Sequence, residues 1–97
     1  MGANIVISPV GVLKEGTLTV NGSGFSAAEG VDVMVVVQAG SSPIDISLGT
    51  STANDSGAFS ETFNLPSSVD VGVWTVRAVG NAGGRASAPI LVLQVAK

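Results

Sequence analysis

Short stretches in which hydrophobic and polar residues alternate recur along most of the chain. In residues 17–21, Leu18 and Val20 fall on one face and the threonines on the other, which is the period-2 pattern of a half-buried β-strand. Such stretches are separated by segments rich in Gly, Ser, Asn and Pro, which favour turns. The pattern predicts β-strands at residues 4–8, 10–13, 17–21, 31–38, 44–52, 58–65, 73–80 and 85–95, and no helix.

The same alternation assigns an inner face to each strand. In the two strands that carry most of the aromatic residues, the inward positions are Phe59, Phe63, Leu65, Trp74, Val76 and Ala78. Trp74 has the largest of these side chains, and we expect it to be the central residue of the core. Glu61 has the same inward parity, which conflicts with burial of a carboxylate. We therefore expect it at a sheet edge, where it reaches water.

Three connecting segments have features that invite a chemical interpretation. Residues 22–30 are rich in glycine but lack the spacing and the lysine of a phosphate-binding loop, so we expect Phe25 to tuck into the core. Asp55 is the only acid in residues 54–57, whereas a calcium site needs about six to eight oxygens, usually from several acids. This segment therefore predicts a turn. Pro9 interrupts the first apolar segment and predicts an edge strand or a switch between two sheets.

Composition excludes several classes of function. The 97 residues include no Cys, no His, 4 Lys or Arg and 7 Asp or Glu, so the formal net charge is −3. Without Cys and His the chain lacks thiolates, the usual general base and the commonest metal ligand, and we expect neither enzymatic activity nor a cofactor or metal. The few basic residues argue against nucleic-acid binding, and no apolar run approaches the roughly 18 residues that membrane insertion requires.

Five segments follow one another in a recognisable order: GSGF, EGVDVMVVV, ANDSGAFSETFNLP, GVWTVRAVG and ASAPILV. In this order they resemble bacterial and phage immunoglobulin-like domains, and the resemblance covers nearly the whole chain. It implies one all-β domain over residues 1–97, an immunoglobulin-like Greek-key β-sandwich of about seven strands without a disulfide. Trp74 stands where related bacterial domains place a corner tyrosine, so its indole N–H can replace that hydrogen bond only in part.

One predicted surface is more apolar than a solvated sheet face needs to be. If the strands at residues 31–38, 73–80 and 85–95 are neighbours, their outward positions include Met34, Val36, Val73, Arg77, Val79, Leu91 and Leu93. A monomer seldom exposes a contiguous apolar patch beyond roughly a few hundred Å². We therefore expect this face to dock on another protein subunit. The alternatives are that loops or the N-terminal segment cover it, or that its valines serve strand propensity alone.

Two functions fit a leaderless, acidic, immunoglobulin-like domain. The first is a phage virion protein, either a head-decoration or an accessory capsid protein, made in the host cytoplasm and bound to capsid subunits or to copies of itself. The second is a spacer or adhesion module from a bacterial cell-surface or secreted multidomain protein. We favour the first, because the sequence lacks a secretory leader and an apolar docking face suits a partner that is always present.

Overall fold

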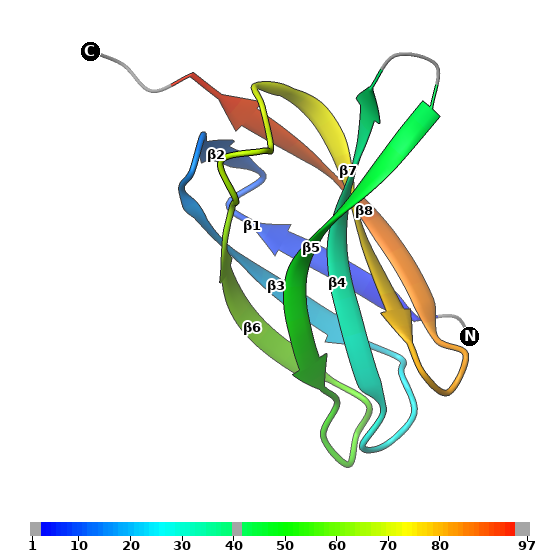
Figure 1. The fold of residues 1–97 in the computed structure, drawn as a ribbon. Helices are drawn as coiled ribbons and strands as arrows, with labels where there is room; N and C mark the ends of the chain where they lie inside the picture. Colours follow the sequence, from blue (N-terminus) through cyan, green and yellow to red (C-terminus); the bar gives the residue numbers. More distant parts are fainter. Residues whose placement is uncertain (1–2, 40–41, 95–97) are drawn as a thin grey trace.

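The computed structural model describes residues 3–39 and 42–94, which form two stacked β-sheets and contain no helix (Figure 1). One sheet has three strands in the order β1-β3-β6, and the other has five in the order β2-β8-β7-β4-β5. The strands are β1 (Asn4–Ser8), β2 (Gly11–Leu13), β3 (Thr17–Ser23), β4 (Gly30–Ala39), β5 (Ser42–Thr52), β6 (Phe59–Asn64), β7 (Gly72–Gly80) and β8 (Arg85–Leu93). The predicted all-β, two-sheet architecture is confirmed, and the Greek-key description stays a prediction.

The described ranges hold eight strands, as the alternation predicted, rather than the about seven that the resemblance implies, and the first apolar segment is divided at Pro9. β1 pairs antiparallel with β3 in the small sheet, whereas β2 runs parallel to β8 in the large one. Pro9 has no N–H to offer to either ladder, which suits a residue that lies between two sheets. The predicted sheet switch is therefore confirmed. Val95, the last residue of the expected final strand, lies outside the described residues.

The core lies between the sheets and follows the predicted alternation. Every second residue of β4 from Val31 to Val37 faces inward, and each of these valines is at most 9% exposed. β-branched side chains pack well on a pleated surface, which explains why such a strand is stable in the interior of the larger sheet, between β7 and β5. Phe59 and Phe63 of β6 are buried in the same core, and Phe25 reaches it from its loop, as predicted.

Trp74 is not the central core residue that its parity suggested. It is half-buried near the start of β7, which is the upper end of the sandwich in Figure 1. The fully buried side chains of this strand, Val76 and Ala78, lie further along it. The indole Nε1 donates a hydrogen bond to the carbonyl of Asp70 at 2.8 Å. An indole that needs an acceptor is best placed where the chain turns into the sheet, and this bond to an upstream carbonyl resembles a tyrosine corner.

Glu61 lies where the sequence predicted it, on β6 at an edge of the small sheet, with an exposed side chain. Its Oε1 accepts a hydrogen bond from Ser51 Oγ of β5 at 3.1 Å. An edge position lets a carboxylate of inward parity remain hydrated, so the alternation is preserved without burying a charge.

Candidate interaction surface

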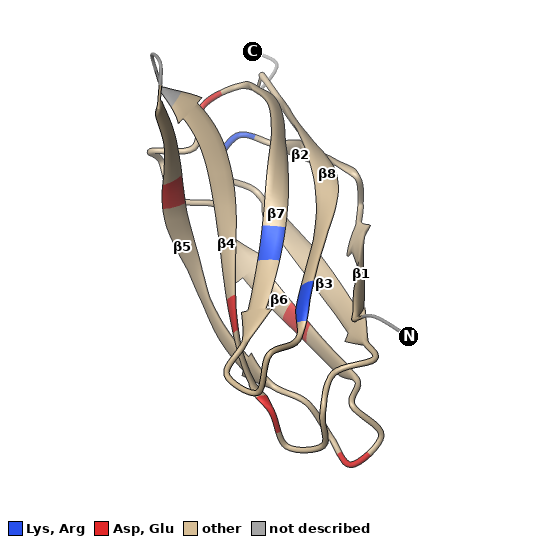
Figure 2. Ribbon diagram, turned by 90° about the vertical axis from the view of Figure 1, so that its right-hand side faces the viewer, with Lys and Arg blue, Asp and Glu red and all other residues tan. Residues whose placement is uncertain are grey.

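The structure places all seven predicted interface residues on the outer face of the large sheet. β4, β7 and β8 are adjacent strands, as the prediction required. Val73 lies opposite Leu91, and Arg77 lies opposite Met34. Figure 2 views this face and shows how few charged residues its strands carry. The residues therefore share a surface, while its use as an interface stays a prediction.

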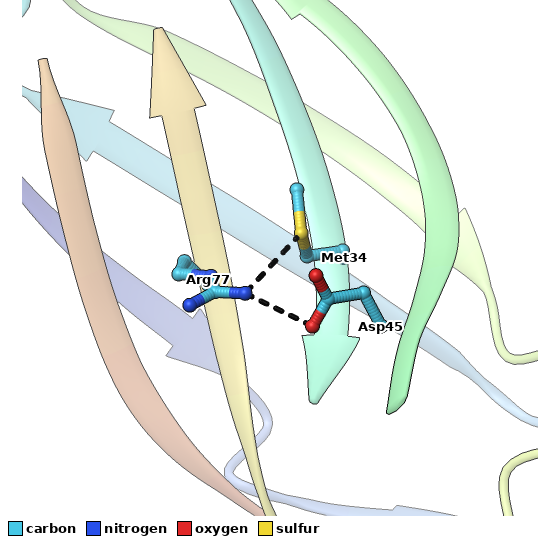
Figure 3. A network of polar contacts seen from close by, with 3 residues as sticks. All are labelled: Met34, Asp45 and Arg77. Atoms are coloured by element: carbon cyan, nitrogen blue, oxygen red, sulfur yellow. Dashed lines mark hydrogen bonds and ion pairs between the residues drawn. The ribbon is translucent and has the colours of Figure 1, made fainter. Parts of the chain in front are cut away.

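The centre of this face is polar and partly covered. Arg77 Nη2 donates to Asp45 Oδ1 at 2.9 Å and lies 3.9 Å from Met34 Sδ (Figure 3). Met34, Val36 and Val79 are only partly exposed. Because both partners of the ion pair are about half-exposed, the pair contributes only about 0–1 kcal/mol to stability. The centre is thus a solvated region of the sheet rather than an open apolar surface.

The exposed apolar side chains of this face lie close together at its upper end. Leu13, Val73, Leu91 and Leu93 are 50%, 69%, 39% and 41% exposed, and we call these four residues the apolar patch. Leu13 lies opposite Leu93 across the β2–β8 pair, and Val73 lies opposite Leu91. These parts of β2, β7 and β8 carry no charged residue in Figure 2. Val73, Leu91 and Leu93 were among the predicted interface residues, whereas Leu13 was not.

Sequence reasoning missed Leu13 and Asp45, for a common reason. Leu13 was expected in a strand, but the parallel pairing that brings it to Leu93 joins two distant parts of the chain. Asp45 lies on β5, and it meets Arg77 of β7 across β4, which lies between these two strands. No local pattern reports which strands become neighbours, so neither contact had a signal in the sequence.

The outer face of the small sheet is different in character. Its paired strands carry mainly Ser, Thr and Asn, and Thr19 Oγ1 lies 2.9 Å from Thr62 Oγ1 across the β3–β6 pair. Val6 is 59% exposed there, but it is a single apolar residue. Isolated exposed valines are common on protein surfaces, so this face is not a candidate for docking.

A second arrangement that sequence reasoning missed is a buried carboxylate at the lower end of the sandwich. Glu29 is 3% exposed. Its Oε1 accepts from the N–H of Ser26 at 2.7 Å, and its Oε2 accepts from the N–H groups of Ala82 at 2.8 Å and Gly84 at 3.0 Å. The N–H of Ser26, above all, and that of Gly84 hold the pKa of Glu29 below its ordinary value, and they outweigh the opposing effect of burial.

Glu29 ties together three loops that are distant in sequence. A Cβ on Gly80 or Gly84 would overlap the Glu29 carboxylate or the Phe25 ring, so the β7–β8 hairpin needs glycine at both positions. The carbonyl of Glu29 also accepts from the N–H of Ala53 at 2.9 Å. The carboxylate itself accepts three hydrogen bonds from two of these loops, which makes its role structural.

The turn after β5 forms as predicted. Asn54 Oδ1 accepts hydrogen bonds from the N–H groups of Ser56 and Ala58, and Gly57 has a φ of 79°. Within residues 3–39 and 42–94 no pocket opens, and no group of three His, Cys, Asp or Glu residues lies close enough to hold a metal. No helix in these ranges is long and apolar enough to cross a membrane.

This geometry, two stacked sheets of three and five strands, is that of an immunoglobulin-like sandwich. The family model of the macroglobulin-like domain matches residues 2–89, and the chain belongs to this immunoglobulin-like β-sandwich family. The predicted likeness to immunoglobulin-like domains is thereby confirmed, while a bacterial or phage origin stays a prediction. No curated protein matches the chain in sequence.

Two solved structures show the same fold at low identity. Macromomycin is 14% identical, with a TM-score of 0.67, and the match covers 95% of this chain and 100% of macromomycin. A superoxide reductase (neelaredoxin) from Ignicoccus hospitalis is 16% identical, with a TM-score of 0.58 over 96% of this chain and 81% of the reductase. At such identities the likeness shows the fold alone, because one sandwich fold hosts many functions.

Proposed function

We propose that this domain is a non-enzymatic structural protein that binds another protein through the apolar patch. The observation that carries this proposal is the adjacency of the four exposed side chains on neighbouring strands. Together they expose the equivalent of about two whole side chains, whose burial is worth about 3–6 kcal/mol at about 1.5–3 kcal/mol each. The absence of Cys and His from the sequence supports a role without catalysis.

The size of the patch favours a partner that presents many equivalent sites. Association costs about 4–15 kcal/mol in lost freedom and side-chain ordering, so the patch alone gives weak binding to an isolated partner. Additional contacts or several linked copies raise the effective affinity. A phage capsid lattice offers such an array, and we therefore propose a head-decoration or accessory capsid protein located on the virion.

A second candidate is the spacer or adhesion module of a bacterial cell-surface or secreted protein. It is supported by the positions of the first and last strands. β1 begins near the lower end of the sandwich and β8 ends near the upper end (Figure 1), and the domain extends 43 Å along its longest axis. Domains with this arrangement can follow one another head to tail in a longer chain.

The two Lys substitutions Val73→Lys and Leu91→Lys, made together, test the proposed function. They place charges on facing positions of the patch, whereas Val6→Lys places a single charge at a valine of the other sheet that is also more than half exposed. We expect the wild type and Val6→Lys to co-sediment with phage heads from the producing cells, and the double variant to stay in the supernatant. Equal binding by all three folded proteins would overturn the docking proposal.

The proposed location on the virion needs a separate test, because the domain can bind a protein through the apolar patch without being a capsid protein. An immunoblot of the producing cells measures the size of the native polypeptide that contains this domain. A band of about the size of one domain that follows the virions supports the capsid proposal. A much longer polypeptide in the cell-surface fraction would overturn it and support the spacer module.

A further inference from the structure

β5 is the last strand of the large sheet, and one side of its first half is unpaired. Its second half meets the small sheet, where Ser51 Oγ donates to Glu61 Oε1. A Cβ on Gly49 would also meet the Phe63 ring there. Residues 43–48 come before this contact, and in Figure 1 they rise above the end of β6. Among the described residues, no strand pairs with them on the side away from β4.

The main-chain groups that face this unpaired side belong to alternate residues. The carbonyl of Gly30 accepts a hydrogen bond from the β7–β8 hairpin at 2.8 Å, so on β4 this residue faces β7. Because main-chain groups alternate along a strand, every second residue of β4 from position 31 to 37 faces β5. Their partners in the first half of β5 are Ile46 and Ile44. Asp45 and Ser47 therefore direct their N–H and C=O groups away from β4.

The side chains of this segment alternate in a symmetric order. Ile46 and Leu48 pack partly against the core, and Ile44 is 47% exposed on the same inner side. Asp45 and Ser47 lie between them and are exposed on the outer face. The order apolar, polar, apolar, polar, apolar is the same in both directions. An antiparallel copy of the segment therefore places apolar side chains opposite apolar ones and polar opposite polar.

We propose that two copies of this chain pair through residues 43–48 of β5, antiparallel and with Ile46 opposite Ile46 of the second copy. Such a contact repeats itself across a twofold axis, which is the commonest symmetry of protein dimers. Asp45 then exchanges main-chain hydrogen bonds with Ser47 of the second copy, and the inner isoleucines of both copies cover one another. An unpaired edge with an exposed apolar row favours such pairing.

Charge favours this register over the neighbouring one. A twofold axis at Asp45 would place two carboxylates directly opposite each other, and like charges at facing positions destabilise a sheet. It would also set Pro43 opposite Ser47, where proline offers a carbonyl but no N–H. In the proposed register each Asp45 lies opposite a serine and keeps its ion pair with Arg77 at 2.9 Å on the outer face.

The pairing is independent of the apolar patch and does not require the proposed function. It joins the two five-stranded sheets into one continuous sheet, because β5 ends the strand order of each. A twofold axis perpendicular to the sheet leaves both apolar patches on the same outer face. A dimer would therefore present two linked patches to a repeating partner, which raises the effective affinity.

A single cysteine at the twofold axis tests the proposal, because the chain has no cysteine of its own. Facing residues that exchange no hydrogen bonds have Cα atoms about 4.5 Å apart, within the range of about 4.4–6.8 Å that a disulfide spans. Cysteines at position 44 of the two copies would lie about 14 Å apart, four residues out of register.

Under mild oxidation we expect Ile46→Cys to form a disulfide-linked dimer at about ten times the rate of Ile44→Cys, or faster. Random collision predicts the opposite order, because Ile44 is the more exposed residue. Equal rates, or faster cross-linking at position 44, would overturn the proposal.

A backbone-directed variant tests the shared edge without a cross-link. Asp45→Pro removes an N–H that faces the second copy but no bond to β4, whereas Asp45→Ala keeps that N–H. Both variants lose the ion pair with Arg77, so they form a matched pair. In sedimentation equilibrium we expect Asp45→Ala to dimerise as the wild type does, and Asp45→Pro to dimerise about tenfold more weakly. If Asp45→Pro does not fold, the cross-linking rates decide.

Three results would contradict pairing through β5. The first is a wild type that stays monomeric at millimolar concentration. The second is a dimer that Val73→Lys and Leu91→Lys abolish and Asp45→Pro does not, because that contact would lie at the apolar patch. The third is protection of the Asp45 and Ser47 amides from hydrogen exchange only when a different protein is added, because the edge would then bind another chain.

Discussion

At the lower end of the sandwich, the Glu29 carboxylate joins its own loop to the β7–β8 hairpin, whereas at the upper end the indole of Trp74 and the apolar patch meet solvent. The exposed large hydrophobic residues show the same division. Apart from Val6, those of the described residues lie near the upper end, namely Val10, Leu13, Ile44, Val71, Val73, Leu91 and Leu93. The loops of the lower end present mostly Gly, Ala, Ser and Asn.

The two ends differ in what they provide, which is stability at the lower end and a surface for a partner at the upper end. The lower end satisfies its buried polar groups and covers its aromatic residues, so it contributes to stability and offers little apolar surface to a partner. The upper end leaves apolar surface uncovered, which costs stability in the free protein and becomes favourable when another chain covers it. We therefore expect substitutions at the lower end to act on folding, and those at the upper end to act mainly on binding.

The largest expected effect is that of Phe25→Ala, which opens the lower end. Phe25 is 6% exposed, and its ring meets that of Phe59 edge to face, with centroids 5.4 Å apart. Truncation of a buried phenylalanine costs about 3–5 kcal/mol, because the cavity collapses only in part. Urea unfolding measures this loss, and Val6→Ala on the exposed face should change stability by about 0.5 kcal/mol or less. A loss below about 1 kcal/mol for Phe25→Ala would show that the lower end is not what holds the fold.

The next effect is the pH dependence that Glu29 gives to the lower end. The pKa of Glu29 in the folded state lies below its ordinary value of 4.5. The stabilisation by the ionised carboxylate is therefore fully present above about pH 4.5 and is lost as pH falls through the folded-state pKa. Glu29→Gln keeps the shape but not the charge, so it should be less stable at pH 7 and should show a shallower decline below pH 4.5.

Two local probes show whether the ends respond separately to acid. Hydrogen exchange of the Ala82 and Gly84 amides, corrected for its intrinsic pH dependence, reports on the Glu29 contacts. Fluorescence of Trp74, the only tryptophan, reports on the upper end. We expect the amides to lose protection in acid before the fluorescence changes. If protection and fluorescence change at the same pH, the domain unfolds as one unit, and the two ends do not open separately.

The alternation of side chains predicted most of the fold because it is a local property of each strand. Each expected strand ends within two residues of the observed one. The switch at Pro9, the edge position of Glu61 and the burial of Phe25 also follow from single residues and their neighbours. What alternation does not report is how far two sheets overlap. Trp74 has inward parity, but it lies near the start of β7, where the inward side chain is only half-buried, whereas Val76 and Ala78 further along the strand are fully buried.

The candidate sites were predictable only where they depend on parity. Three residues of the apolar patch were expected on an outer face, whereas Leu13 joins them through a pairing with a distant strand. Glu29, next to Gly30, reads as an ordinary loop residue. Its burial depends on amides of a hairpin about fifty residues later in the chain. Long-range partners of this kind decide whether a carboxylate is exposed or buried, and a single sequence contains no record of them.

The smallest expected effect is that of Trp74→Phe at the upper end. The change removes the hydrogen bond from Nε1 to the Asp70 carbonyl but keeps an aromatic ring at the same place. A typical hydrogen bond contributes about 0.5–1.5 kcal/mol, and the half-exposed position lets water take over the carbonyl. We expect a loss of about 1 kcal/mol in urea unfolding, with no change in protection of the Gly84 amide. A loss as large as that of Phe25→Ala would mean that the upper end, too, is needed to hold the sandwich together.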